Sequence, residues 1–90
     1  MILGKVIGTI VSTKKDERLV GFKLLVVREY DVKMNPTSST VVAVDTVGAG
    51  FDELVLVVSG SSARQTAKTD KKPVDAAIVG IVDSVSLKEE

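Results

Sequence analysis

The segment Asp45-Thr46-Val47-Gly48-Ala49 comes nearest to a catalytic motif in this chain of 90 residues. Aspartic protease chemistry needs two symmetry-related Asp side chains that share one proton across a tight Thr-Gly turn. Here Val47 separates Thr46 from Gly48, which interrupts that turn. We therefore interpret Asp45 as a residue at the end of a strand. The protease alternative would require a dimer with two paired copies of Asp45.

Lys33 is the candidate attachment point for a carried group. The segment Val32-Lys33-Met34 is similar to the Met-Lys-Met hairpin on which biotin-carrier domains present a modified lysine. The first Met of that motif is absent here, and Asn35-Pro36 follows directly. A solvated loop lysine is the simpler interpretation. A small all-β carrier or ligand-binding module with Lys33 as its functional residue stays open as the alternative function.

Two further segments have residue types that bind phosphates or other anions. Gly48-Ala49-Gly50 could open a dinucleotide-binding fingerprint, but Glu53 stands at the third glycine position and no long helix is expected after it. Arg64 follows Ser61 and Ser62 near an expected helix start, where an anion could bind. A structural role for Arg64, paired with a carboxylate or a backbone carbonyl, is favoured over an anion site.

Composition excludes several classes of function. The 12 basic residues balance the 12 acidic ones, and the chain has no His, Cys or Trp. Thiol catalysis, a His general base, imidazole or thiolate zinc sites and disulfides are therefore excluded. A neutral chain with three aromatic residues is a poor binder of nucleic acid or anionic membranes. The Asp residues lack calcium-loop spacing. We expect a non-enzymatic, cytoplasmic protein without metal, cofactor, nucleic-acid partner or membrane association.

The elements that must position these residues are mainly strands. Val, Ile and Thr are abundant in the chain, and β-branched side chains favour strands. Ser62 and Gln65 fit a capping box, which predicts one short α-helix between the last two strands. Residues 1–90 are expected to form a single domain, an all-β, five-stranded small barrel of the oligonucleotide-binding (OB) type. The strands are expected at residues 2–13, 19–32, 41–44, 53–58 and 76–87, with a loop at 35–39.

Several expected strands are apolar on both faces. A small barrel has one interior, so each strand needs only one apolar face. We assign the alternating residues from Val20 to Val26, together with Val55 and Val57, to the interior. The surplus apolar residues on the opposite faces predict burial against another subunit. The expected interface residues on these faces are Leu25, Val27, Leu54 and Leu56.

Five segments form a connected pattern over nearly the whole chain: residues 4–13, 19–25, 43–50, 58–65 and 73–83. In these segments the chain resembles the pentameric vertex proteins of bacterial microcompartments, the EutN/CcmL family, and is closest to its ethanolamine-utilisation branch. One departure is visible at the glycine turn, where the family commonly has Gly-x-Gly-x-Gly-Glu. Here Phe51 and Asp52 precede Glu53, so the family pattern does not predict the detailed shape and charge of this loop.

The resemblance implies a structural function. Five copies would form a truncated pyramid, a homopentamer that closes the five-fold vertices of a protein shell tiled by hexameric shell proteins. It also implies that Gly48, Ala49 and Gly50 form a loop near the axial pore. As glycines of a tight turn, Gly48 and Gly50 are expected to adopt positive φ angles. Arg64 is expected at the subunit interface, bridging to its own barrel or to the adjacent subunit.

Overall fold

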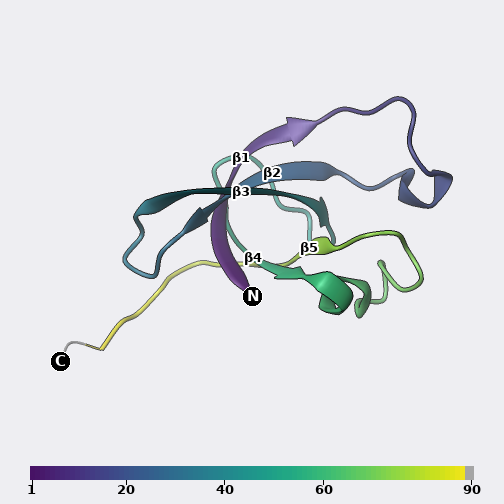
Figure 1. Ribbon diagram of the computed structural model, residues 1–90. Helices are drawn as coiled ribbons and strands as arrows, with labels where there is room; N and C mark the ends of the chain where they lie inside the picture. Colours follow the sequence, from purple (N-terminus) through teal and green to yellow (C-terminus); the bar gives the residue numbers. More distant parts are fainter. Residues whose placement is uncertain (89–90) are drawn as a thin grey trace.

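The computed structural model, which describes residues 1–88, is a closed barrel in which the strands follow the order β1-β2-β3-β5-β4 (Figure 1). Two 3₁₀-helices, η1 and η2, lie between strands. The elements in chain order are β1 (Ile2–Ile10), η1 (Glu17–Leu19), β2 (Leu24–Tyr30), β3 (Pro36–Asp45), β4 (Leu54–Ser59), η2 (Gly60–Arg64) and β5 (Ala76–Ile81). The expected all-β, five-stranded barrel is confirmed.

Antiparallel pairing dominates the sheet, and one parallel contact closes it. β1, β2 and β3 form an antiparallel meander, and β4 pairs antiparallel with both β1 and β5. β5 runs parallel to β3, where Val44 pairs with Ala77 and Asp45 pairs with Ile78. This short parallel contact joins the two ends of the sheet. It also brings the start of the β3–β4 connection next to β5.

The barrel interior is filled by small and β-branched side chains. Val27, Val55, Val57 and Ile78 are fully buried, and alternate residues on each strand point inward as the pleat requires. Complete burial of each such side chain stabilises the fold by roughly 1.5–3 kcal/mol. The remaining members of this cluster are Val6, Leu25, Ala43, Ala49 and Ala76.

A second apolar cluster lies outside the barrel. η2 and the loop that follows it contribute Ala63 and Val74, which pack with Val44 and Ala77. Half-buried residues from β2, β4, β5 and the β1–β2 connection surround this cluster: Leu19, Phe22, Leu24, Val58 and Val79. Part of the apolar surplus seen in the sequence is therefore covered by loops of the same chain.

The expected α-helix is instead the 3₁₀-helix η2. It is five residues long, and its N-cap residue Ser59 makes no side-chain capping hydrogen bond. The Gln65 N–H donates to the Ser62 carbonyl, a bond between residues three apart that is typical of 3₁₀ geometry. The side chains of Ser62 and Gln65 do not form the expected capping box. Within residues 1–88 the chain has no α-helix.

The third strand is longer than its expected range. Residues 36–39, expected to be a loop, belong to β3, which begins at Pro36. A proline is tolerated at the first residue of a strand, where its missing N–H breaks no interior ladder. The turn is made instead by residues 31–35, where the Met34 N–H donates to the Asp31 carbonyl. At the other end of the chain β5 stops at Ile81, so residues 82–87 are not part of a strand.

Candidate functional site

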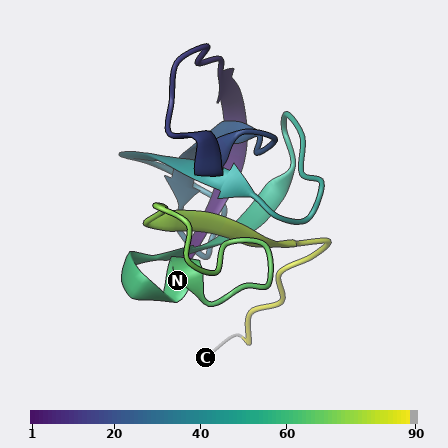
Figure 2. The same ribbon diagram turned by 90° about the vertical axis from the view of Figure 1, so that its right-hand side faces the viewer.

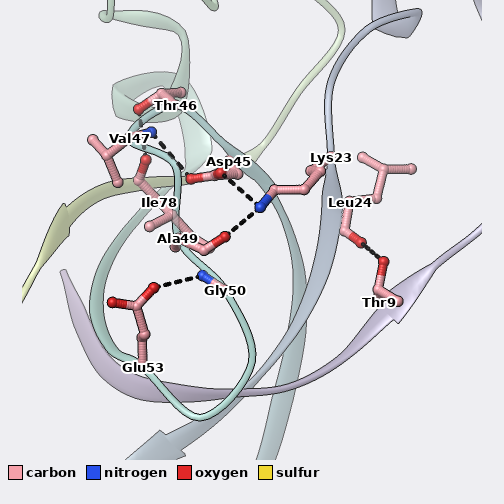
Figure 3. A network of polar contacts seen from close by, with 10 residues as sticks. All are labelled: Thr9, Lys23, Leu24, Asp45, Thr46, Val47, Ala49, Gly50, Glu53 and Ile78. Atoms are coloured by element: carbon pink, nitrogen blue, oxygen red, sulfur yellow. Dashed lines mark hydrogen bonds and ion pairs between the residues drawn. The ribbon is translucent and has the colours of Figure 1, made fainter.

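The β3–β4 loop, residues 46–53, is held against two strands of the barrel (Figure 3). The Thr46 hydroxyl donates to the carbonyl of Ile78 in β5 over 2.6 Å. At the other end, the Asp52 N–H donates to the Val6 carbonyl (2.9 Å), and the Val6 N–H donates to the Glu53 carbonyl (3.0 Å). The loop is therefore fixed at both ends, which gives its tip a defined position.

Asp45 ends β3 and anchors this loop. Its side chain is only 4 % exposed, and one carboxylate oxygen lies 3.6 Å from the Lys23 Nζ atom. The other oxygen accepts a hydrogen bond of 3.0 Å from the Val47 N–H. Lys23 also donates to the Ala49 carbonyl, so it joins the carboxylate to the loop backbone (Figure 3). This environment confirms Asp45 as a strand-end residue and gives its carboxylate a structural role.

The three expected pore-loop residues differ from one another. Gly48 has a φ of 77°, as expected for a glycine in a tight turn. Ala49 is buried in the barrel core, so its methyl group does not face solvent. The positive φ expected at Gly50 is wrong, because the left-handed residues of the loop are Gly48 and Asp52. The Gly50 N–H donates instead to the Glu53 carboxylate over 2.8 Å.

Phe51 and Asp52 form the exposed tip of the loop. Phe51 is 76 % exposed, which is unusual for an aromatic side chain. Asp52 adopts a φ of 69°, and its carboxylate lies 3.8 Å from Lys5 Nζ. In the sequence, both residues stand out only as departures from a family pattern.

The expectation that Leu25 and Val27 of β2 lie at the subunit interface is wrong. In the single chain Leu25 is 4 % exposed and Val27 is 0 % exposed, because both point into the barrel. A side chain enclosed by its own barrel cannot contact a neighbouring subunit. On β4 the faces are as expected, because Val55 and Val57 face inward while Leu54 and Leu56 are half-buried on the outside. A contact of Leu54 and Leu56 with another subunit stays a prediction.

Arg64 is half-buried at the end of η2 and binds its own chain. Its Nη1 donates to the carbonyl of Val74, in the loop before β5, over 2.9 Å. This contact ties η2 to that loop and helps to hold the second apolar cluster in place. A contact of Arg64 with an adjacent subunit stays a prediction.

Lys33 lies at the exposed tip of the β2–β3 hairpin. The backbone around it is fixed by Asp31, whose carboxylate accepts hydrogen bonds from the Lys33 and Asn35 N–H groups. The Asn35 bond is the main cause that lowers the pKa of Asp31. The Lys33 side chain itself makes no hydrogen bond or ion pair within residues 1–88. It is a solvated lysine in a well-formed turn.

No enclosed polar site is found within residues 1–88. Every buried side-chain nitrogen or oxygen atom described there has a hydrogen-bond partner. The described residues contain no group of three or more acidic, His or Cys side chains that could hold a metal ion.

A shallow cleft of about 430 Å³ beside Asp45 is lined in part by Arg18, Lys68 and Lys72. None of the helices in the described part of the chain could cross a membrane.

Residues 1–83 match the family model described as ethanolamine utilisation protein EutN/carboxysome. The microcompartment shell vertex protein GrpN of Rhodospirillum rubrum is 60% identical over 85 residues, which cover 94% of this chain and 96% of GrpN. The shell vertex protein PduN of Salmonella typhimurium is 48% identical over 90 residues, covering 96% of this chain and 99% of PduN.

Solved structures agree in fold as well as in sequence. The pentameric microcompartment shell protein GrpN from Rhodospirillum rubrum superposes with a TM-score of 0.90 at 57% identity, covering 98% of this chain and 100% of that one. CcmL from Gloeobacter violaceus gives a TM-score of 0.92 at 47% identity, covering 97% of this chain and 90% of that one. The likeness therefore extends over the whole barrel.

Proposed function

The chain belongs to the EutN/CcmL family, and from this membership we propose that five copies form a ring that caps the five-fold vertices of a bacterial microcompartment shell. The observation that carries the proposal is the match to the pentameric GrpN shell protein over the full length of that protein. The function is structural, since the homologues are named as shell vertex proteins.

The chemistry of the chain supports a structural role without catalysis. Asp45 is the carboxylate in the segment that comes nearest to a catalytic motif. It forms an ion pair with Lys23 and accepts a hydrogen bond from the Val47 N–H. In this proposal the protein works in the bacterial cytoplasm, within the shell, and contacts hexameric shell proteins around each vertex. Such contacts use the outer surface of the barrel, because its interior is filled by its own side chains.

A closed ring needs two different patches on each subunit that fit one another. The outer face of β1 and β4 supplies an apolar patch, where Leu3 pairs in register with Leu56 and Leu54 lies two residues further along. Gly80 lies opposite Leu56 in β5 and leaves that leucine accessible from outside the sheet. The proposed interface therefore consists of Leu54 and Leu56, with Leu3 as a further member. Arg64 is kept as a proposed interface residue on a separate part of the surface.

The loop of residues 46–53 is proposed to line the five-fold axis. Its anchors to β1 and β5 give it the fixed position that a pore rim requires. With Ala49 buried, the exposed side chains that could face the axis are those of Val47, Phe51 and Asp52, while Gly48 and Gly50 contribute backbone. This arrangement would give the rim an aromatic and acidic character.

Native mass spectrometry of the purified chain tests the proposal. We expect an assembly of five chains, each with the mass calculated from the sequence. A dimer would contradict the ring and favour the paired-Asp45 alternative. A single chain with added mass on Lys33 would contradict it in favour of the carrier alternative. Electron microscopy of shells made with and without the protein checks the second half of the proposal, because shells without it should lack closed vertices.

A further inference from the structure

The last described residues, 83–88, project from the barrel as an extended segment (Figures 1 and 2). Val85 and Leu87 alternate with Ser84, Ser86 and Lys88, which gives the segment one apolar and one polar side. Both apolar side chains are exposed in the single chain. Within residues 1–88, the hydrogen bonds described include none made by 83–88. The segment therefore has the pattern of a strand, and among the described residues no strand pairs with it.

The register of β5 directs this segment away from one apolar groove of its own barrel. Gly80 pairs with Leu56 and Ile81 with Val55, after which the Val82 N–H donates to the Leu54 carbonyl. Continuing in that direction, residues 83–88 move past Leu54 and away from Leu56. None of these six residues lines the groove beside Leu56.

That groove lies on the outside of the barrel, where the start of β1 meets the end of β2. It has a volume of about 530 Å³, and its apolar wall consists of Met1, Ile2, Leu3, Tyr30, Val32 and Leu56. The acidic residues Glu29 and Asp31 also line it. Because Leu3 and Leu56 belong to the proposed subunit interface, the groove is continuous with that interface.

We propose that residues 83–88 form an arm that docks in this groove on a second copy of the chain, with Val85 and Leu87 against the apolar wall. The inference rests on the proposed ring, since it needs a neighbour at a fixed position. An arm and a groove are two different patches, which is the kind of contact that a closed ring of identical subunits requires. Six extended residues span at most about 20 Å, enough to reach across the edge of a barrel of this size.

Cysteine cross-linking tests the arm, and the absence of Cys from the natural chain makes the result easy to interpret. The double variant Leu87→Cys/Val32→Cys places one thiol on the arm and one in the groove. Oxidation with diamide joins them only if the Cα atoms approach within about 7 Å. We expect a ladder of covalently linked chains on a non-reducing gel, up to the five-chain product. A disulfide formed within one chain, or no disulfide, overturns the proposal.

Two controls exclude cross-linking by random motion of the arm. Leu87→Cys/Val11→Cys uses Val11, which is 86 % exposed and lies far from the groove residues in the β1–β2 connection. Ser86→Cys/Val32→Cys places the thiol on the polar side of the arm. Both should give a much weaker ladder than Leu87→Cys/Val32→Cys. Ladders of equal strength in all three variants mean a mobile tail and overturn the proposal.

A second measurement avoids cysteines. Val85→Ser/Leu87→Ser should lower the urea concentration at which the assembly dissociates, whereas Ser84→Ala/Ser86→Ala should leave it unchanged. All variants are first examined by native mass spectrometry. If the unmodified chain itself is not pentameric, the proposed function fails. If the chain is pentameric and both serine and alanine variants dissociate at the same urea concentration, only the arm fails.

Discussion

Gly4 of β1 lies against Val27 of β2 so closely that a Cβ atom on Gly4 would be 2.5 Å from Val27 Cγ1. The Arg28 carbonyl oxygen would be 2.6 Å away. We expect Gly4→Ala to lower the free energy of unfolding by about 1–3 kcal/mol, because the two strands must separate. Gly8→Ala is the control, since its Cβ would make an ordinary contact of 3.8 Å with Val26. Urea unfolding of both variants measures the difference, and equal losses would contradict the prediction.

Gly48 and Gly50 should respond differently to alanine. Gly48 has a φ of 77°, a conformation that costs an alanine about 1–2 kcal/mol. Gly50 lies outside this region, and its Cβ would be 3.6 Å from the Glu53 carboxylate. Thermal unfolding should show a clear loss for Gly48→Ala and little change for Gly50→Ala. A larger loss at Gly50 than at Gly48 would refute this account of the loop.

Substitution of Leu by Asp should have different effects on the outer and the inner face of the barrel. Leu56→Asp places a charge on the proposed interface, so we expect the pentamer to dissociate while circular dichroism still shows a folded barrel. Leu25→Asp buries a charge inside the barrel and should prevent folding at a cost of several kcal/mol. Leu56→Met is the conservative control. A Leu56→Asp variant that remains pentameric at micromolar concentration would exclude Leu56 from the interface.

Lys23 should contribute to stability through the buried carboxylate of Asp45. Lys23→Ala removes the ion pair and the bond to the Ala49 carbonyl, leaving a carboxylate that is 4 % exposed without its cation. We expect a loss of about 1–3 kcal/mol in the free energy of unfolding. Lys14→Ala, in the exposed β1–β2 connection, should change it by less than about 0.5 kcal/mol. If both variants unfold alike, the Lys23 contacts are without energetic consequence.

Asp16 and Arg18 form an exposed ion pair in which Arg18 Nη2 lies 2.8 Å from the carboxylate. The hydrogen bond from the Arg18 side chain is the main cause that lowers the pKa of Asp16 to about 2. Because the folded pKa lies below the ordinary value, the contribution of the pair is complete above that value and is lost as the pH falls through about 2. An NMR titration of the Asp16 carboxyl carbon checks this, with Arg18→Ala expected to raise the midpoint.

The number of strands and their order along the chain could be predicted, because β-branched residues alternate between turn signals. Which face of β2 lies inside could not be predicted from that alternation. Leu24 and Val26 are as apolar as Leu25 and Val27, and Leu24 is covered by the second cluster under η2. The faces differ only in what the rest of the chain places against them. That information lies in contacts between residues far apart in the sequence.

The dependence on contacts between distant residues also explains why the side chains exposed by the β3–β4 loop could not be predicted. Gly48 is predictable as a turn residue from its type alone. The burial of Ala49 depends on how the loop crosses the end of the barrel, and the bonds from Thr46 to Ile78 and from Asp52 to Val6 decide that path. Since no local pattern encodes those partners, the sequence predicted a glycine loop without showing which side chains it exposes.

The parallel contact between β3 and β5 has a consequence for synthesis. Val44 and Asp45 acquire their partners in β5 only when Ala77 and Ile78 have left the ribosome. Until then the barrel stays open between β3 and β4, and inward side chains such as Val27 and Val57 lack the cover that Ile78 provides. Long-range pairing of this kind folds slowly, and exposed apolar strands aggregate. The nascent barrel is therefore most prone to aggregation before β5 has emerged and paired with β3.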